Sequence, residues 1–418
     1  MALPAALKAL EHRDFRVYWM GQAVSLVGTW MQMMAQGWVV TELSTDAFVL
    51  GLLNAAGSLP IMLLSLKGGE LADRLEKRRI LVATQIAMMF LAFAMAVLVF
   101  AGVLQLWHVF ALAILTGITT AFDLPAAQSM PPELVEPKDI PNAVALMQAV
   151  FHGARLVGPA VAGILIARFG RGSAFVANGV SFLAVIGTLL VLKPRPKKAG
   201  GPGKGKGSIG EGWTYVKGEP AVKALIGLTT LITAFVFPFM AVLMVYYVRY
   251  ALGTDDAQVM GMFMSVSGLG SVVGAGAILT GAAGSRRVWL VGGVIGAAIG
   301  IAGLSLVQSV PFAVACSGLV SFSVSSLMGR ISQMIQERVP GELRGRVMGI
   351  FSISFTGMMP LASLLWSFLA DRLGHATGYV LVMRVSAVLF AVLSLGVLAR
   401  SWSALAPQAP EPEPAPAS

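Results

Sequence analysis

Long, uninterrupted runs of hydrophobic residues recur along the whole chain, and short polar segments separate them. A helix needs about 20 mostly apolar residues to cross the hydrocarbon core of a bilayer. Strands of a transmembrane barrel would instead alternate polar and apolar positions over about 10 residues. The runs therefore predict an all-α integral membrane protein with twelve spanning helices, near residues 16–41, 48–67, 80–102, 107–127, 143–168, 173–192, 222–250, 257–280, 287–307, 311–332, 346–370 and 377–400.

A basic segment rich in glycine divides these helices into two groups of six. Such a composition is typical of a flexible linker, although Trp213 to Val216 predict a short helix at the membrane surface. Shifting one half by 204 residues places Arg168-Phe-Gly170 on Arg372-Leu-Gly374. Repeated halves of this kind hold a substrate site at their interface. We expect an N-terminal six-helix bundle, a cytoplasmic linker, a C-terminal six-helix bundle and a disordered proline-rich tail, at residues 1–192, 193–220, 221–402 and 403–418.

The basic residues gather on one side of the membrane in this arrangement. Of the 30 Lys and Arg, 23 lie in inner segments when the N-terminus is placed inside, four lie outside and three lie within spans. Positive residues stay in the cytoplasm, so both termini should be cytoplasmic. The net charge of +10 then follows from membrane topology and needs no nucleic-acid partner. Only 12% of residues are charged, against roughly 25% in soluble domains.

The loop between the second and third helices carries a compact set of charged residues. It reads Gly69-Glu-Leu-Ala-Asp73-Arg74-Leu-Glu76-Lys77-Arg78-Arg79. The glycine permits close backbone approach, Asp73 can cap a helix start, and the basic side chains can reach carboxylates and helix ends. Gly69, Asp73, Arg74, Lys77, Arg78 and Arg79 are therefore candidates for a cytoplasmic gate, with a simple positive-inside anchor as the alternative.

This loop resembles the signature loop of the major facilitator superfamily. Further segments look like the enterobactin-exporter-like and drug-efflux branch of that superfamily: His12 to Gln22, Ser25 to Trp30, Phe122 to Pro125, Arg155 to Pro159 with Gly163, and Gly345 to Gly349. The resemblance implies the twelve-helix fold in two pseudo-repeat halves, export through alternating access, and a monomer in a bacterial inner membrane. It also implies antiport for the glycine–proline pattern of the fifth helix, where Gly158, Pro159 and Gly163 permit a bend and close packing.

Polar residues within the spans suggest a central cavity. Gln22, Ser25, Thr29, Gln32 and Gln36 share one face of the first helix, within a sector of about 80°. Buried amides need partners, so this face should line water or contact another helix. In the second half, flexible thioethers and aromatic rings suit an adaptable pocket. The remaining cavity candidates are Gln148, His152, Arg155, Thr233, Phe237, Met240, Met244, Phe355 and Met358.

Asp123 and Arg155 are charged residues within predicted spans, where charge is costly and commonly functional. Asp123 is a candidate for proton coupling or for a structural or gating role. Arg155 is a candidate partner for Asp123 or a cavity charge for an anionic substrate, and His152 is a second titratable candidate.

No nucleotide-binding loop, catalytic constellation or metal-ligand cluster occurs in the sequence, so we expect neither an enzyme nor a cofactor. We expect an exporter of amphipathic or hydrophobic small molecules of the drug or siderophore type, driven by proton antiport. A lipid or lysolipid flippase, or an importer, on the same fold remains the alternative. A scaffold without transport would leave the polar face of the first helix unexplained.

Overall fold

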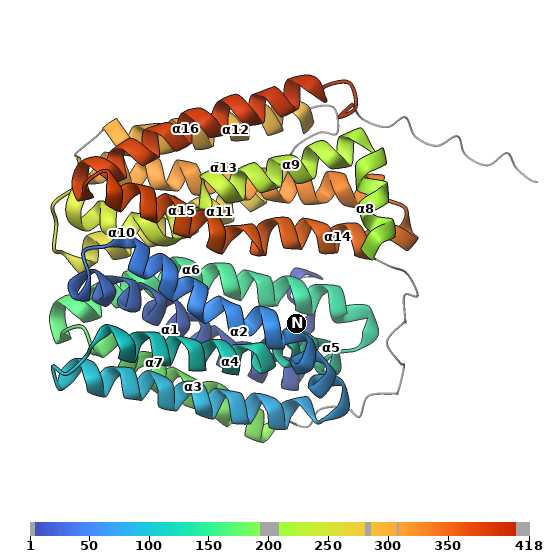
Figure 1. Ribbon diagram of the computed structural model, residues 1–418. Coiled ribbons are helices and arrows are strands. Elements are labelled where there is room, and N and C mark those ends of the chain that lie inside the picture. Colours follow the sequence, from blue (N-terminus) through green and yellow to red (C-terminus); the bar gives the residue numbers. More distant parts are fainter. Residues whose placement is uncertain (1–4, 193–208, 281–285, 307–308, 407–418) are drawn as a thin grey trace, which may run out of the picture.

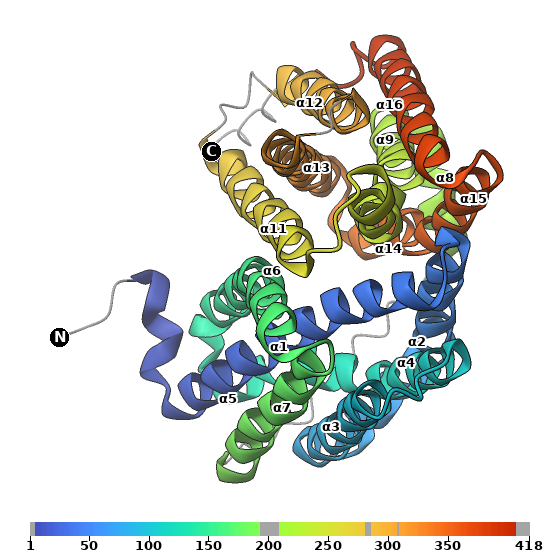
Figure 2. The same ribbon diagram turned by 90° about the vertical axis from the view of Figure 1, so that its left-hand side faces the viewer.

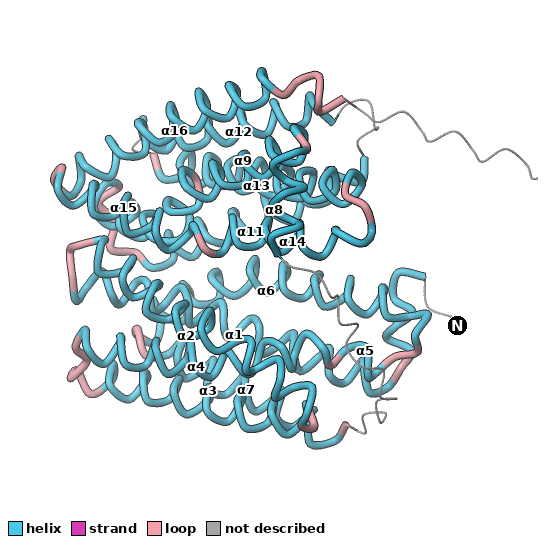
Figure 3. The backbone as a smooth tube through the Cα atoms, turned by 45° about the vertical axis from the view of Figure 1, so that its right-hand side comes forward, coloured by secondary structure: helices cyan, strands magenta, loops and turns pink. Residues whose placement is uncertain are grey.

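The computed structural model describes residues 5–192, 209–280, 286–306 and 309–406, and over these ranges it contains helices and connecting loops but no strand (Figure 3). The proposed linker at 193–208 and most of the proline-rich tail, at 407–418, lie outside the described residues. So do several side chains within the ranges, including that of Asp73.

Six long helices form the N-terminal group, which fills the lower half of Figure 1. A short 3-10 helix, η1, precedes them at Ala5–Glu11, and two short turns, α5 (Pro131–Leu134) and η2 (Pro137–Asp139), follow the fourth. The long helices are α1 (Arg13–Leu43), α2 (Ala47–Arg74), α3 (Lys77–Phe100), α4 (Leu106–Ser129), α6 (Ile140–Phe169) and α7 (Ser173–Val191).

The C-terminal group occupies the upper half of Figure 1 and begins with the short helix α8 (Ile209–Gly218), which confirms the helix expected around Trp213. Its further segments are α9 (Pro220–Phe235), η3 (Phe239–Leu243), α10 (Met244–Tyr246), η4 (Tyr247–Ala251), α11 (Ala257–Thr280), α12 (Arg286–Leu306), α13 (Val310–Arg338), α14 (Gly341–Thr356), α15 (Met358–Arg372) and α16 (His375–Arg400). Counted along the whole chain, the seventh span is built from α9, η3, α10 and η4, and the eleventh is built from α14 and α15.

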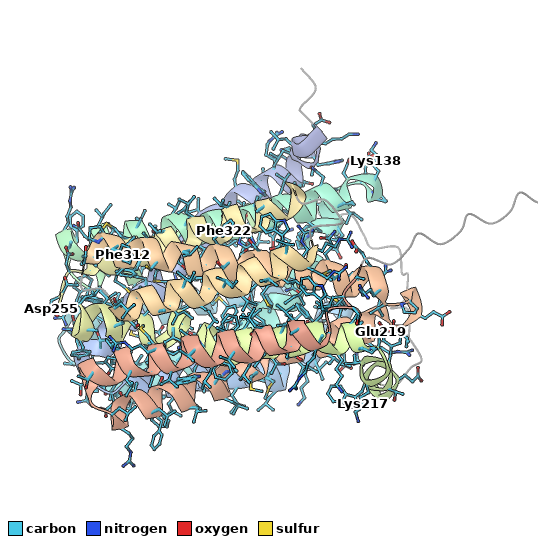
Figure 4. All side chains as sticks on the ribbon, turned by 90° about the horizontal axis from the view of Figure 1, so that it is seen from above. Lys138, Lys217, Glu219, Asp255, Phe312 and Phe322 are labelled. Atoms are coloured by element: carbon cyan, nitrogen blue, oxygen red, sulfur yellow. The ribbon has the colours of Figure 1, made fainter. Side chains whose placement is uncertain are left out.

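The long helices run side by side between two ends of the molecule (Figure 1). η1, α5 and α8 lie at one end, which we call the terminus end. The loops that follow α1 and α15 lie at the other, the opposite end. Figure 4 shows the same division, with Lys138, Lys217 and Glu219 at the terminus end and Asp255 at the opposite end.

Within the part of the chain that the structure describes, eleven helical segments are long and apolar enough to cross a bilayer by length and composition. α1 is the remaining long helix. Its 31 residues would span about 46 Å at 1.5 Å per residue, but its three glutamines and its charged start lower its hydropathy. With α1 packed along α6 and α7, the expected all-α fold is confirmed. The outer surface is apolar, as a lipid-facing surface should be, with exposed Leu66, Phe90, Val97 and Val392.

Two proline residues divide helices that the sequence predicted as continuous. Pro238 cannot donate to the carbonyl of Ala234, four residues earlier, and Trp366 Nε1 donates to that free oxygen instead, at 2.8 Å. Two π-helical segments follow, η3 and η4. Pro360 removes the equivalent bond to Thr356, where α14 ends. Several helices also extend beyond the predicted spans at the terminus end, because their last turns are polar and leave the hydrocarbon.

Candidate functional site

The two halves are joined at the opposite end through Asp371, near the end of α15. Its carboxylate accepts hydrogen bonds from the backbone N–H groups of Ala47 (3.0 Å) and Phe48 (2.8 Å), in the first turn of α2. The hydroxyl of Tyr379 donates to the carbonyl of Thr45 at 3.2 Å. α2 and α15 lie side by side when the molecule is seen from this end (Figure 2).

A second set of polar contacts ties the seventh span to the end of α1. The hydroxyl of Tyr246 donates to the carbonyl of Asp46 (2.9 Å), and that of Tyr250 to the carbonyl of Thr41 (3.0 Å). The guanidinium of Arg249 donates to the Thr41 hydroxyl at 2.8 Å. Tyr246 and Tyr250 stack at 5.9 Å between ring centroids. The polar groups of the junction therefore lie among aromatic rings.

Close backbone packing of α6 on α11 completes the junction between the halves. A Cβ atom at Gly261 would lie 2.6 Å from the carbonyl oxygen of Pro159, and one at Gly268 would lie 2.9 Å from the Cα of Leu156. Only glycine permits this approach. Every hydrogen bond that joins the two halves between described residues lies at the opposite end. This end is thus closed.

A pocket of about 600 Å³ lies beside the closed junction, between α1, α6 and the loop before α11. It contains Glu42, which pairs with Arg171, and Asp255, whose carboxylate lies 3.2 Å from Arg249. Arg249 also lies over the ring of Trp38, at 5.4 Å from its centroid. Because Glu42 and Asp255 pair with the two arginines of the pocket, it is better read as part of the junction than as the predicted cavity.

The polar face of α1 turns largely toward neighbours in its own half. The Gln22 amide donates to the hydroxyl of Tyr18 at 3.1 Å, and Gln32 accepts from Asn178 of α7 at 2.7 Å. Ser25 is buried, whereas Thr29 is exposed and Gln36 is half-buried. Helical periodicity defined the face but could not say that α7 would cover part of it.

Arg155, His152 and Gln148 lie on α6 close to Trp30 of α1. The guanidinium carbon of Arg155 is 5.5 Å from the centroid of the Trp30 ring. Trp30 contacts Phe151 edge-on at 5.6 Å. Gln148 is exposed, and Arg155 and His152 are half-buried. These residues form one cluster, which we call the Arg155 cluster.

Asp123 of α4 and Arg155 do not pair. The Asp123 carboxylate instead accepts hydrogen bonds from the Thr84 hydroxyl (2.6 Å) and the Gln85 amide (3.0 Å) of α3. Sequence reasoning missed both partners, since nothing in the sequence states that α3 and α4 meet at this depth. A polar pair within an apolar run at 80–102 was the available signal.

The basic loop after α2 makes its described contacts within the N-terminal half. Lys77 is buried and pairs with Glu133 at 2.6 Å. The guanidinium of Arg78 donates to the carbonyl of Leu190 at 2.8 Å, at the end of α7. Among the described side chains, Arg74 pairs with Glu70 and Arg79 pairs with Glu76. A Cβ atom placed on Gly69 would meet no described atom within 4 Å. The side chain of Asp73 lies outside the described residues.

Helix α6 runs unbroken through Pro159. A Cβ at Gly158 would lie 2.7 Å from the Cβ of Trp30, and one at Gly163 would lie 3.0 Å from the carbonyl oxygen of Ala257. The glycines thus serve close packing on two sides of the helix, toward α1 and toward α11.

The cavity candidates of the C-terminal half divide into two groups. Thr233 and Met244 are buried in the core of that half. Phe237 and Phe355 contact each other edge-on, with ring centroids 4.8 Å apart. Phe237, Met240, Phe355 and Met358 are all half-buried. Among the described residues, no group of three or more acidic, histidine or cysteine side chains could hold a metal ion.

Three relatives match most of this chain over most of their own length. A multidrug efflux pump, Tap, of Mycolicibacterium fortuitum is 25% identical over 84% of this chain and 88% of its own length. Macrolide efflux protein A of Streptococcus pyogenes is 25% identical over 86% and 90%. A staphyloferrin A transporter of Staphylococcus aureus is 24% identical over 83% and 87%.

Solved structures share the fold at low sequence identity. A bacterial homologue of the human lysosomal transporter Spinster superposes with a TM-score of 0.72 at 12% identity, over 94% of this chain and 96% of that one. The nucleoside transporter NupG gives a TM-score of 0.73 at 12% identity, over 92% and 98%. The model of the family described as "Transmembrane secretion effector" matches residues 4–417. The chain therefore belongs to this transmembrane secretion effector family of the major facilitator superfamily of transporters.

Proposed function

We propose that this protein is a secondary active exporter of amphipathic or hydrophobic small molecules of the drug or siderophore type, working by alternating access. The observation that carries the proposal is the one-sided junction between the halves. Hydrogen bonds between described residues of the two halves gather at the end that holds Asp371 and Tyr246. A transporter must seal one end at a time, and two halves whose hydrogen bonds between described residues gather at one end can rock about that junction.

The relatives support export as the direction of transport, and they support the proposed class of substrate. Two are named as efflux proteins for drugs, and one is named as a transporter of staphyloferrin A. Along α6, exposed Gln148 and half-buried Arg155 stand beside the aromatic rings of Trp30 and Phe151. Such a mixture of polar and aromatic groups suits amphipathic compounds.

We further propose that protons supply the energy, with Asp123 in the coupling path. Its carboxylate is held by the neutral groups of Thr84 and Gln85, without an ion pair among the described side chains. A carboxyl group inside a membrane protein without a cation partner is a common proton carrier. The bacterial relatives support a location in the bacterial inner membrane, and the distribution of basic residues supports both termini in the cytoplasm. We also propose that the protein works as a monomer.

Transport by the purified protein in proteoliposomes tests the proposal. With an imposed pH gradient, we expect wild-type protein to move hydrophobic dyes or siderophores, and Asp123→Asn to lose gradient-driven movement. Glu342→Gln is the matched control, because Glu342 is an exposed carboxylate in the first turn of α14. Movement that survives in Asp123→Asn would place coupling elsewhere. If only labelled lipids move, the protein is a lipid transporter and the proposed export of soluble compounds is wrong.

A further inference from the structure

Arg155 lies on the face of α6 that points between the two helices packed against it. Gly158 marks the contact with α1, and Leu156 and Pro159 mark the contact with α11. Val144, Gln148, Phe151 and Arg155 fall within a sector of about 60° between these two contacts, at about 100° per residue. The opposite face presents exposed Val157 and Ile164 and is wholly apolar there, as expected for lipid contact.

Arg155 and Nδ1 of His152 have no hydrogen-bond partner among the residues that the structure describes. The guanidinium of Arg155 makes no hydrogen bond and no ion pair with any described residue, and its carbon lies over the Trp30 ring. Nδ1 of His152 is buried and also lacks a hydrogen-bond partner there. Phe151 contacts both Trp30 and His152, with ring centroids 5.6 Å apart in each pair. The Arg155 guanidinium and the His152 imidazole therefore adjoin an aromatic wall.

Other arginines within the spans differ from Arg155. Arg384 donates to the carbonyl of Ser305 at 3.1 Å, at the end of α12. Arg249 reaches Thr41 and Asp255. A cation within a membrane is costly, and these two residues offset the cost with fixed partners. Among the described residues, Arg155 has the aromatic face of Trp30 as its neighbour and no hydrogen-bond acceptor, which leaves its N–H groups available to a group that arrives from outside the protein.

We propose that the Arg155 cluster is a binding site for the oxyanion of an amphipathic substrate, a carboxylate or a group of the same geometry. The planar guanidinium can donate two parallel hydrogen bonds to such a group. His152 can donate a third when Nδ1 carries the proton, and the aromatic part of the substrate stacks on Trp30 and Phe151. The proposal rests on the proposed transport function, and it specifies in addition that the substrate carries a negative charge.

A matched pair of fluorescent probes tests the site by binding alone, without transport. Dansylglycine carries a carboxylate, and dansylglycinamide has the same aromatic body without the charge. For the full-length protein in detergent micelles, we expect the carboxylate to bind about ten- to a hundredfold more tightly than the amide, the range of hydrogen bonds to a charged group. Arg155→Gln should bring the ratio near one, and Arg155→Lys should keep part of it because the charge remains.

Arg384→Gln is the control, since it removes another arginine of the spans and should leave the ratio unchanged. Monodisperse elution and an unaltered affinity for dansylglycinamide show that Arg155→Gln is folded. Equal affinity of wild-type protein for both probes, no binding of dansylglycine, or a ratio that survives Arg155→Gln would each overturn the proposal. If the charge preference is absent but pH-driven dye movement persists in proteoliposomes, export stands and only the anionic site is lost.

Discussion

The carboxylate of Asp371 on α15 caps the first turn of α2 from the other half of the molecule, 2.8 Å from the backbone nitrogen of Phe48. Asp46 occupies the N-cap position of α2, yet its own side chain makes no capping bond. A helix start carries unpaired N–H groups and a partial positive charge, so an anion is favoured there. The α2 start is therefore satisfied only while the two halves are together at this end.

Replacing Asp371 should weaken the closed end. Asp371→Ala removes two charge-assisted bonds to Ala47 and Phe48, and a charge at a helix start is worth about 1 kcal/mol, up to 2 in partly buried geometries. We expect roughly a five- to thirtyfold shift of population toward states open at this end. Spin labels at Val103 and Phe312, exposed near this end, report the separation of the halves by pulsed electron resonance.

Glu342→Gln is the control for this measurement, because Glu342 is an exposed carboxylate in the first turn of α14 and takes no part in the junction. Asp371→Asn retains an acceptor oxygen and should shift the distances less than Asp371→Ala. Unchanged label distances in Asp371→Ala would show that the tyrosine contacts and the glycine packing of α6 on α11 suffice to hold the end closed.

Gly158 and Gly153 of α6 offer a matched test of helix packing. A Cβ at Gly158 would approach Trp30 Cβ to 2.7 Å and the Val27 carbonyl oxygen to 2.8 Å, whereas one at Gly153 would meet nothing within 4 Å. Gly158→Ala should thus cost about 1–3 kcal/mol through overpacking. Gly153→Ala should be neutral or slightly stabilising, since alanine favours helix. Unfolding by SDS titration in mixed micelles compares the two, and equal midpoints would contradict this reading.

Serine side chains join α11 to α13 in the C-terminal half. The hydroxyl oxygens of Ser267 and Ser321 lie 2.6 Å apart and are buried. Hydrogen bonds between membrane helices contribute about 0.6 kcal/mol on average. A double-mutant cycle with Ser267→Ala and Ser321→Ala should give a coupling of that order in SDS titration. A coupling indistinguishable from zero would leave the small-residue packing of Gly270 against Gly318 as the main contact.

The order and type of the helices could be predicted because hydrophobic length reports directly on a bilayer. Which helices lie next to one another across the bundle could not be predicted from the sequence. Periodicity placed Gln22 and Gln32 on one face of α1, but the partners of that face, Tyr18 in the same helix and Asn178 in α7, follow from tertiary packing. Pro238 was visible in the sequence, yet a single proline does not show whether a helix kinks or changes its hydrogen-bond pattern.

In the candidate site, too, the sequence predicted individual residues but not their neighbours. Arg155 was selected from sequence because an arginine inside a span is costly, and the structure adds Trp30 as its neighbour. Asp371 was not selected, because many helices end with a carboxylate. Its role follows only from the structure, which places it against the start of α2. The basic loop was expected to act as a gate, and the described contacts of Lys77 and Arg78 tie it to its own half. Its gating role stays a prediction.

Lys77 and Glu133 provide the sharpest test of what that loop does for stability. The ammonium of Lys77 is buried, lies 2.6 Å from the Glu133 carboxylate and also donates to the carbonyl of Ser129 at 3.2 Å. Removing one member of a buried pair leaves an uncompensated charge and costs about 3–5 kcal/mol. Arg79 and Glu76 form the exposed counterpart in the same loop, where a pair contributes about 0–1 kcal/mol.

We therefore expect Glu133→Ala to lower the SDS unfolding midpoint strongly and Glu76→Ala to leave it nearly unchanged. The double variant Lys77→Met with Glu133→Leu should recover much of the loss, since it replaces the buried pair with apolar groups. If the loop served only as a charged anchor, both single variants would unfold alike. A large loss in Glu133→Ala with recovery in the double variant would instead assign Lys77 to holding α3 against the segment after α4.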